Sequence, residues 1–465
     1  MSILPNGSSF TYGAPTGVET MKTDAKRRTF LASSLATGTG LMLLPSGTLA
    51  GKGAGGKLNI ALIGAYGRGR QHHHDLKQEN VVAICDVHGE NMASAAAEFP
   101  EAKQYTDWRK CLDRKDLDAV VICTPDHHHA FISIWAMNRG LHVYCEKPLG
   151  DCVHEARAVR EVYLKNKGKL ATQHGTQRHA FPNFDRVAEM VKGGAIGELQ
   201  DVHAWGNRFH DKTAYLPDAG QPPANIDWEQ WIGPVRWHPY NPDYFDLRPG
   251  RGCLMWNMYN DFGSWQIGDM GSHVMDLAWN AIDADRPTKI KASGDPFNPE
   301  VCPSQLTTIF TMPPNDWRDE IRLVWYQGGP RPKSPFNAVD LEKIGHGVMF
   351  KGTKGVIVAD FNNRILIPMG KDTDMSYYTP PEKGREPMDG FMQQWFNACK
   401  GDLKTDCDFD YAGRMVETLM LGLVAHEAGK ELEYDAAKGV VVNDAAANNA
   451  QSMRKTYREG WTLNG

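Results

Sequence analysis

Cysteine is scarce in this sequence and follows no recognisable pattern of use. The nine cysteines among 465 residues are dispersed, odd in number and never in CxxC spacing. Neither a zinc ribbon nor a disulfide scaffold is therefore indicated. We expect most of these thiols to be buried as small apolar side chains.

Excess positive charge is also missing. Lys and Arg number 51 against 56 Asp and Glu, the formal net charge is −5, and no long basic run follows the first thirty residues. This charge pattern speaks against a nucleic-acid partner. The composition, 41% hydrophobic and 23% charged, is that of an ordinary globular protein, and the sequence contains no internal repeat.

The first fifty residues contain the outline of an export signal. Residues 26–31 read Lys-Arg-Arg-Thr-Phe-Leu, residues 31–44 are apolar but diluted with Gly, Ser and Thr, and residues 48–50 offer small side chains for cleavage. The alternative, a membrane anchor, is disfavoured because about fourteen weakly apolar residues are too few to span a bilayer. The polar stretch before Met21 leaves open whether translation starts at Met1 or Met21.

Within this segment, the basic residues resemble the twin-arginine consensus. Arg27 and Arg28 match its paired arginines, whereas Lys26 and Ala32 depart from it. We therefore expect residues 1–50 to be a twin-arginine signal peptide, the protein to be periplasmic, and the twin-arginine export machinery to be one of its partners.

A strand followed by a glycine turn opens the remaining sequence. Residues 58–63 form a short apolar run, and Gly64-Ala65-Tyr66-Gly67-Arg68-Gly69 follows before an expected helix. In a dinucleotide-binding fingerprint, Gly64 would allow the tight turn and Gly69 the close packing of helix on strand, while helix amides receive the pyrophosphate. Tyr66 stands where a second glycine is expected, so the phosphates would follow a different path past Gly67 and Arg68. A plain turn is the alternative.

The next apolar strand, residues 81–85, ends in Asp86. A carboxylate at this position would accept hydrogen bonds from the adenosine ribose and would repel a 2′-phosphate, so NAD is favoured over NADP as the cofactor. The alternative is that Asp86 only caps a turn.

Two runs of three histidines, residues 72–74 and 127–129, invite a metal interpretation. Neighbours on a helix point in different directions, whereas metal-binding helices present ligands one turn apart. We therefore predict no metal site. The second run follows a strand at residues 119–123 and Thr124-Pro125, where proline suits the start of a helix.

A fourth strand near residues 141–145 leads into Glu146-Lys147-Pro148, and residues 168–172 are predicted to form a further strand. In their order and spacing, the glycine turn, Asp86, Thr-Pro-x-x-x-His and Glu-Lys-Pro resemble the Gfo/Idh/MocA oxidoreductases, which include glucose-fructose oxidoreductase and inositol dehydrogenase. The resemblance implies an α/β protein whose N-terminal domain, residues 57–175, is a Rossmann fold with a doubly wound parallel sheet. It also implies NAD contacts by Thr124, Pro125, His129, Glu146 and Lys147.

In that family the lysine of Glu-Lys-Pro reaches the substrate hydroxyl beside the nicotinamide, so the resemblance gives this role to Lys147. Pro148 biases Lys147 to an extended conformation at the carboxyl end of a strand, where doubly wound folds bind ligands. Beside a cationic nicotinamide, the ammonium would be easier to deprotonate. A solvated surface lysine is the alternative.

Residues 176–465 resemble the family's second domain, an α+β domain with a large open, mostly antiparallel sheet that binds substrate and supports homo-oligomers. Gln177-Arg178 marks its entry, and we expect Arg178 to bind substrate. A helix is expected over residues 184–192. Strands are expected over residues 199–205, 307–312 and 321–326.

Asp269 and His273 are spaced to share one face of a helix, so a carboxylate and an imidazole could converge on one substrate. The family carries the same pair, which implies proton transfer by His273 and substrate binding or histidine orientation by Asp269. The alternative is that Asp269 only caps the helix.

Residues 228–265 are unusually dense in Trp, Tyr, Pro and Arg. Aromatic rings stack on sugar faces, so a carbohydrate pocket or an oligomer contact is expected there, with loop packing as an equal alternative.

The predicted reaction is hydride transfer between a sugar carbon and nicotinamide while Lys147 or His273 takes the hydroxyl proton. Because free NAD is not expected outside the cytoplasm, we predict a tightly held NAD, loaded before export. One alternative is a redox-neutral NAD-dependent glycosidase, which oxidises, eliminates, hydrates and reduces a single substrate. Another is a protein that binds NAD and sugar without turnover.

Overall fold

The computed structural model describes residues 56–247, 253–370, 373–379, 388 and 390–464 of the chain. The expected signal peptide, residues 1–50, lies outside the described residues. In the part that is described, no helix is long and apolar enough to cross a membrane. Both sheets of the protein belong to one compact unit.

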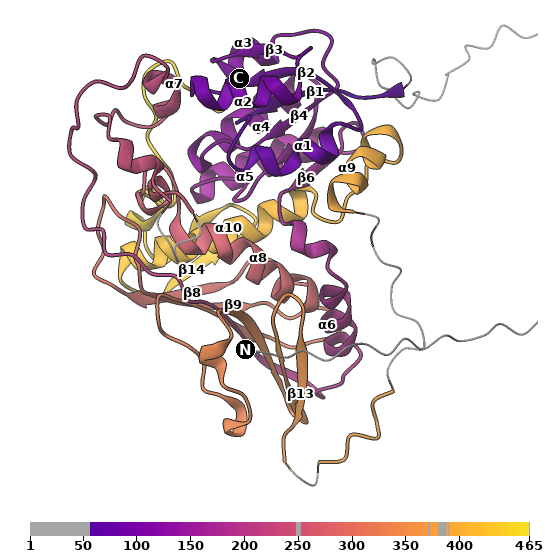
Figure 1. Ribbon diagram of the computed structural model, residues 1–465. Helices are drawn as coiled ribbons and strands as arrows, with labels where there is room; N and C mark the ends of the chain where they lie inside the picture. Colours follow the sequence, from indigo (N-terminus) through magenta and orange to yellow (C-terminus); the bar gives the residue numbers. More distant parts are fainter. Residues whose placement is uncertain (1–55, 248–252, 371–372, 380–387, 389, 465) are drawn as a thin grey trace, which may run out of the picture. The chain divides into compact units, whose positions relative to one another are not determined.

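The first sheet consists of six parallel strands in the order β3-β2-β1-β4-β5-β6 (Figure 1). The strands are β1 (Asn59–Ile63), β2 (Asn80–Cys85), β3 (Lys103–Tyr105), β4 (Ala119–Ile122), β5 (His142–Cys145) and β6 (Thr172–His174). Strands β1, β4 and β5 are buried along almost their whole length, as expected where helices cover both faces of a parallel sheet. The strand order reverses between β1 and β4, and ligands bind at such a switch point. The predicted Rossmann fold is thereby confirmed.

The helices that accompany this sheet vary in length. They are η2 (Gly69–His72), α1 (His73–Leu76), α2 (Gly89–Glu98), α3 (Trp108–Leu112), η3 (Asp126–His128), α4 (His129–Asn138) and α5 (Val153–Lys165). Of these, α2, α4 and α5 are the longer ones.

One predicted strand of this half is wrong. The sequence predicts a strand over residues 168–172, whereas residues 166–169 form a turn, with Gly168 at a φ of +81°, and β6 begins only at Thr172. The side chains of β6 are polar although they are fully buried. A hydrophobic pattern therefore cannot mark this strand.

The second sheet has nine strands in the order β13-β12-β11-β7-β10-β9-β8-β14-β15. They are β7 (Leu199–Gly206), β8 (Lys289–Gly294), β9 (Leu306–Met312), β10 (Ile321–Gln327), β11 (His346–Gly352), β12 (Gly355–Ala359), β13 (Arg364–Pro368), β14 (Leu432–Asp435) and β15 (Val440–Val441). Of the paired strands in this sheet, β7 and β10 run parallel and the others antiparallel. The predicted large, mostly antiparallel sheet is confirmed.

Helices α6, α8 and α10 accompany this sheet, and α8 contacts β7 while α10 contacts β8 (Figure 1). The helices of this half are η4 (Gln177–Ala180), α6 (Pro182–Lys192), α7 (Trp228–Ile232), η5 (Pro242–Phe245), η6 (Met255–Met258), α8 (Trp265–Ala281), η7 (Pro335–Asn337), η8 (Leu341–Lys343), α9 (Phe391–Lys400), α10 (Phe409–Ala428) and η9 (Ala446–Asn449). Helix α10 starts where the Asp408 side chain accepts two backbone N–H groups and ends at Gly429 in the left-handed conformation.

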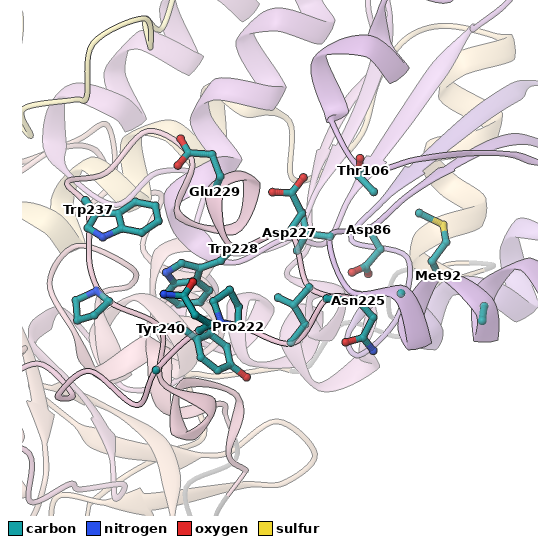
Figure 2. A pocket seen from close by; sticks show the side chains of 18 of the residues that line it. Asp86, Met92, Thr106, Pro222, Asn225, Asp227, Trp228, Glu229, Trp237 and Tyr240 are labelled. Atoms are coloured by element: carbon teal, nitrogen blue, oxygen red, sulfur yellow. The ribbon is translucent and has the colours of Figure 1, made fainter.

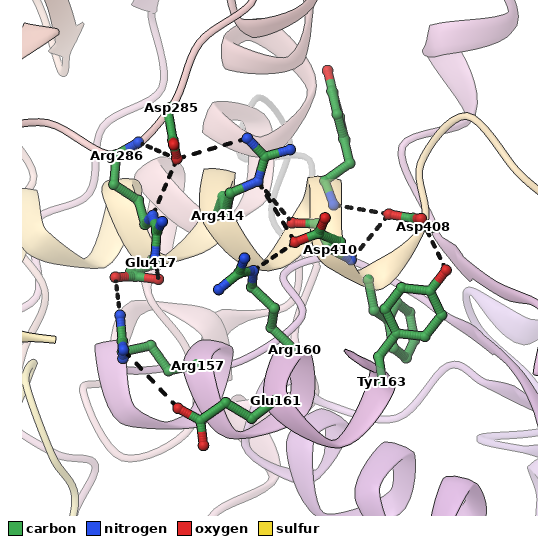
Figure 3. Close-up of polar contacts among 12 residues, drawn as sticks. Arg157, Arg160, Glu161, Tyr163, Asp285, Arg286, Asp408, Asp410, Arg414 and Glu417 are labelled. Carbon is green, nitrogen blue, oxygen red and sulfur yellow. Dashed lines mark hydrogen bonds and ion pairs between the residues drawn. The ribbon is translucent and has the colours of Figure 1, made fainter. Parts of the chain in front are cut away.

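Helix α10 also contacts α5, so it joins the two halves of the chain (Figure 3). Arg157 and Arg160 on α5 form ion pairs of 2.7 Å with Glu417 and Asp410 on α10. The Glu417 carboxylate is fully buried, and a buried carboxylate requires such a partner.

The last part of the chain returns to the first sheet. Trp395 on α9 belongs to the same buried cluster as Ile60 on β1. Further along, the Lys455 ammonium forms a buried ion pair with Asp151, which precedes α5. The core of the nucleotide-binding half is therefore completed by residues from the end of the sequence.

Candidate active site

The glycine turn after β1 is built as the fingerprint requires. Gly64 has a φ of +77°, and a Cβ there would lie 2.5 Å from the carbonyl carbon of Cys123. A Cβ at Gly69 would lie 2.1 Å from the Gly64 oxygen. Gly67, at a φ of +59°, has open space where its Cβ would be. The expected helix is present as η2 and the four-residue α1.

Asp86 lies at the carboxyl end of β2, where a ribose-binding carboxylate is expected. Its Oδ2 accepts a hydrogen bond from the Ala65 N–H (3.0 Å) and its Oδ1 one from the His88 N–H (2.9 Å). Burial raises the pKa of this carboxyl. Each oxygen has a further lone pair, so Asp86 can support the turn and still bind a ligand.

The histidines after β4 serve the packing of the chain. His127 and His128 donate from Nε2 to the Trp231 carbonyl at 2.9 and 3.0 Å, and His129 Nδ1 lies 2.7 Å from the Pro148 carbonyl oxygen. Burial lowers the pKa of all three imidazoles, that of His128 to about 4. These rings are neutral and bound to carbonyl groups, which accounts for them without a metal.

Glu146 ties the glycine turn to the end of β5. Its Oε1 lies 2.8 Å from both Arg68 Nε and His72 Nε2. Burial acts to raise the pKa of Glu146, but Arg68 and His72 outweigh it and the pKa is lowered. An ionised, buried carboxylate thus fixes Arg68 beside the turn.

Lys147 follows on the same strand end and meets two residues from the second half. Its ammonium forms an ion pair with one oxygen of Asp269, and Arg208 forms an ion pair with the other. Burial acts to lower the pKa of Lys147, but Asp269 and Asp126 outweigh it and the pKa is raised. The chain's own carboxylates therefore oppose the deprotonation expected from the sequence.

Asp269 and His273 lie one turn apart on α8, and both are buried. The helix begins at Trp265, so Asp269 is not its cap. His273 Nδ1 is buried without a hydrogen-bond partner. Burial, followed by Lys147 and Arg178, holds the pKa of His273 well below its usual range. The imidazole is therefore neutral and available to accept a proton.

Arg178, at η4, and His346, at the start of β11, gather around the ring of Phe361. The Arg178 guanidinium carbon lies 3.9 Å from the ring centroid, and the rings of His346 and His273 lie 6.5 Å from it. Arg208 and His346 were missed by the sequence analysis because neither lies in a recognisable motif. The signal available for Arg208 was its place just after β7.

Most of these groups line one cavity. Its volume of about 510 Å³ suits a small-molecule site. The predicted residues that line it are Gly64, Tyr66, Gly67, Arg68, Asp86, Thr124, Pro125, His129, Glu146, Lys147 and Asp269. The lining residues do not include Gly69, whose place is in the packing of the turn, or Arg178 and His273. Ile226, Gln230 and Asn257 line it as well and were not predicted.

The residues of this cavity fit NAD. The Thr124 hydroxyl lines the cavity and is buried with no hydrogen-bond partner. Asp86 stands where the ribose is expected, and the missing side chain at Gly67 leaves room at the turn. Gly64, Gly67, Asp86 and Thr124 would hold the cofactor.

The aromatic stretch packs mainly on itself. Trp228 and Trp231 stack with ring centroids 4.5 Å apart, and both are buried in one cluster with Tyr244. Trp237, by contrast, is 56% exposed. Loop packing therefore explains most of these rings, whereas Trp237 is exposed and its ring contacts the Arg458 guanidinium, 5.8 Å from the ring centroid.

This stretch also walls a second cavity, of about 880 Å³ (Figure 2). Asp86 and Thr106 of the first half line one part of it, and Trp228, Trp237 and Tyr240 line another. Asp86 and Thr106 line the cofactor cavity as well, so the two cavities adjoin at the end of β2.

A buried group of His179, Asp276 and Cys407 lies elsewhere among the described residues, with ligand-type atoms within 4.8 Å of one another. His179 Nδ1 lies 2.9 Å from Asp276, which also accepts a hydrogen bond of 2.6 Å from Tyr411. These contacts satisfy the group internally. It involves neither of the histidine runs.

Comparison with known proteins supports the assignment from fold and site. Residues 58–174 match the family described as "Oxidoreductase family, NAD-binding Rossmann fold" (GFO_IDH_MocA). An inositol 2-dehydrogenase of Salmonella paratyphi B is 29% identical over 160 residues, which are 33% of this chain and 46% of that protein. The chain thus matches about half the length of that relative.

A longer match extends over both halves. A glycosyl hydrolase family 109 protein of Stenotrophomonas maltophilia is 30% identical over 366 residues, which are 74% of this chain and 75% of that protein. The structure of the WlbA dehydrogenase of Bordetella pertussis, in complex with NADH and UDP-GlcNAcA, has a TM-score of 0.58 at 14% identity and covers 82% of this chain and 99% of that one. At this identity the likeness shows the fold alone.

Fold and site therefore define a protein with an NAD-binding Rossmann half and a second half built on an open sheet. With the long match to a relative, they show that the chain belongs to the Gfo/Idh/MocA oxidoreductase family.

Proposed function

We propose that this protein is an NAD-dependent oxidoreductase that acts on a hydroxyl group of a sugar or sugar derivative. One observation carries the proposal: Asp269 brings Lys147 from the nucleotide-binding half and Arg208 from the second half together at the cofactor cavity. NAD, when bound, supplies the acceptor or donor of the hydride.

The chain's own residues would position the hydroxyl and move its proton. Lys147, held as an ammonium by Asp269, would donate a hydrogen bond to the hydroxyl oxygen and stabilise the charge that develops there. His273, held neutral, would accept the proton during oxidation and return it during reduction. Asp269 would keep the Lys147 ammonium and the Arg208 guanidinium in place.

Several wider features belong to the same proposal. Arg27 and Arg28 support export by the twin-arginine route to the periplasm. Such export would require NAD to be tightly bound and loaded beforehand. Residues 57–175 would act as the NAD-binding domain and residues 176–465 as the substrate domain of a homo-oligomer.

A second candidate is a redox-neutral glycosidase, and the long match to a glycosyl hydrolase family 109 protein favours it. His273, as the neutral base, would then also remove a proton from the carbon next to the oxidised one. Glu146-Lys147-Pro148 resembles the dehydrogenase branch and favours the first candidate. Retention of Lys147, Asp269 and His273 argues against a third, non-catalytic candidate.

The test is to incubate the purified protein with free sugars and chromogenic glycosides, without added nicotinamide, and to record reduced-cofactor absorbance together with aglycone release. We expect one turnover of cofactor reduction by a free sugar, lost in Lys147→Ala and kept in Lys343→Ala, whose side chain is 83% exposed. Sustained aglycone release without reduced cofactor would establish the glycosidase instead. Binding of NAD and sugar with neither signal would leave the non-catalytic candidate.

A further inference from the structure

The substrate end of the site carries more positive than negative charge. Lys147 and Arg208 share the single carboxylate of Asp269. Among the described residues, neither Arg178 nor Arg331 forms an ion pair with a carboxylate, and both act on the His346 imidazole together with Arg208. Arg331 Nη1 is buried without a hydrogen-bond partner, and the residue also lines a separate cavity. Arg178 and Arg331 are half-buried, and cations that are partly withdrawn from water are stabilised by an anion, so this arrangement points to an anionic ligand.

The neighbouring groups do not supply that anion. Burial raises the pKa of Asp126 well above its usual range, so Asp126 carries less of the negative charge here than Asp269, whose pKa is lowered. Burial, followed by Arg208 and Arg178, lowers the pKa of His346 to about 4. Arg178 lies against the Phe361 ring, which holds its guanidinium toward His346 and His273 without neutralising it.

We propose that Arg178, Arg208 and Arg331 bind an anionic group of the substrate, and that the enzyme acts on acidic sugars. The proposal rests on the proposed function, because it names the substrate class of that site. Planar guanidinium groups match the paired oxygens of a carboxylate or sulfate. Lys147 and His273 remain available for the reacting hydroxyl.

Calorimetric titration of the NAD-loaded protein tests this inference. The ligands are galacturonate, glucuronate and glucose 6-sulfate, each compared with neutral galactose or glucose. We expect at least one acidic sugar to bind about tenfold or more tightly than its neutral parent. Comparing the two uronates with glucose 6-sulfate shows whether the site prefers a carboxylate or a sulfate. Neutral sugars that bind as well as all three acidic ones would overturn the inference.

Substitutions test which arginines recognise the anionic group of the ligand. Arg178→Gln and Arg331→Gln should each reduce the acidic-to-neutral affinity ratio about tenfold, whereas Arg178→Lys should keep part of it. Arg322→Gln, at a side chain that is 61% exposed on β10, is the matched control and should not change the ratio. An unchanged ratio in both Gln variants of the site would refute the assignment. If the protein oxidises only neutral sugars, the oxidoreductase proposal is supported and the proposal of acidic substrates is refuted.

A separate observation concerns residues 215–240, here called the strap. It is attached to the end of β2 and the start of α2 by backbone bonds, since Gly89 N–H donates to the Asn225 carbonyl (2.7 Å) and Asp227 N–H to the Val87 carbonyl (2.9 Å). Ile226 lines both the cofactor cavity and the adjoining cavity of Figure 2.

The strap has a second attachment beside the cofactor cavity. A Cβ at Gly233 would lie 2.1 Å from Cε1 of His128, so the strap backbone packs directly on that ring. The Trp231 carbonyl receives the hydrogen bonds of His127 and His128. The strap is therefore fixed at both ends of the segment that lines the cavity.

We infer that the strap closes the adenosine side of the cofactor cavity, and that bound NAD leaves only after the strap separates from α2. This inference also rests on the proposed function, since it explains how the cofactor would be retained. Contacts that exist only in the closed state slow release more than binding.

A reversible cross-link provides the test. A Cβ at Gly89 would lie 3.2 Å from the Asn225 Cβ, close to the roughly 3.8 Å of a disulfide. In the NAD-loaded double variant Gly89→Cys with Asn225→Cys, oxidation should slow NAD release about tenfold, and dithiothreitol should restore it. Each single variant is a control. A cross-link confirmed by mass spectrometry that leaves the release rate unchanged would overturn the inference.

Ile226→Ala should have the opposite effect to the cross-link. NAD release should become about tenfold faster because apolar contact is lost. Ile365→Ala, at an isoleucine 48% exposed on β13, is the control and should release NAD at the original rate. Normal release from Ile226→Ala would count against the strap while leaving the oxidoreductase proposal intact. If the native protein binds no NAD at all, both the strap inference and the oxidoreductase proposal are refuted.

Discussion

Lys147 and His273 hold different charge states within one site. The carboxylates near Lys147 keep it an ammonium, whereas burial and neighbouring cations keep His273 a neutral imidazole. Proton acceptance therefore falls to His273 and hydrogen-bond donation to Lys147.

This division predicts the pH dependence of sugar oxidation. Because the pKa of His273 lies well below 6.5, the imidazole is already neutral at pH 6.5, and kcat/KM should be constant from about pH 6.5 to about 8.5. The rate should fall only at lower pH, as His273 gains a proton. Steady-state kinetics across this range, with bound NAD present, measure the profile.

The same profile in His273→Asn should lose its acid limb and fall about a hundredfold or more in rate. An acid limb centred at pH 7 or above in the native protein would contradict the assigned charge state of His273.

At the scale of single residues, the sequence predicts the site residues that lie in short motifs. Lys147, Asp269 and His273 are recognised because Glu-Lys-Pro and Asp-x-x-x-His are local patterns. Arg208 and His346 are not, because they reach the site only through the pairing of β7 with β11. Their role depends on tertiary contacts that no local pattern records.

Among the elements, the segment formed by η3 and the first turn of α4 buries three histidines in neutral form. The pKa of His128 falls to about 4, below the ordinary value of 6.5 that the unfolded chain would show. Between these values the unfolded chain binds more protons, so the stability due to the neutral ring is full above pH 6.5 and is lost as the pH falls toward 4.

The free energy of unfolding should therefore decrease between pH 6.5 and pH 5, by about 1.4 kcal/mol per pH unit for each such histidine. Urea unfolding at several pH values measures this slope. His128→Gln should reduce the slope by about one proton, whereas His74→Gln, at an exposed histidine of the first run, should not change it. Equal slopes in the native protein and His128→Gln would contradict the prediction.

The elements that the sequence predicts correctly are those whose burial shows in their side chains. Strands β1 and β4 read as apolar runs, and β9 alternates between buried and half-buried positions. Strand β6 was misplaced because Thr172, Gln173 and His174 are buried polar residues. Their burial is set by neighbouring elements and leaves no hydrophobic signal.

At the scale of the whole molecule, the end of the chain stabilises its beginning through Lys455 and Asp151. Both side chains lie in the interior, and removing either one takes away the ion-pair partner of the other. We therefore expect Lys455→Met to lower the free energy of unfolding by about 3–5 kcal/mol. Chemical denaturation provides the measurement.

Adding Asp151→Asn to Lys455→Met should recover much of this loss, because the uncompensated carboxylate is then removed. Lys438→Met, which breaks an exposed ion pair with Asp435, should cause no measurable change. Equal effects of Lys455→Met and Lys438→Met would show that burial of the pair does not matter.

The return of α9 to β1 also sets an order of events during synthesis. Strand β1 leaves the ribosome hundreds of residues before Trp395, which packs in the same buried cluster. At about 5–20 residues per second, the nucleotide-binding half therefore waits tens of seconds for its last core side chains. A nascent chain that stops before α9 would therefore lack part of the core beneath β1, although every residue that lines the cofactor cavity precedes α9.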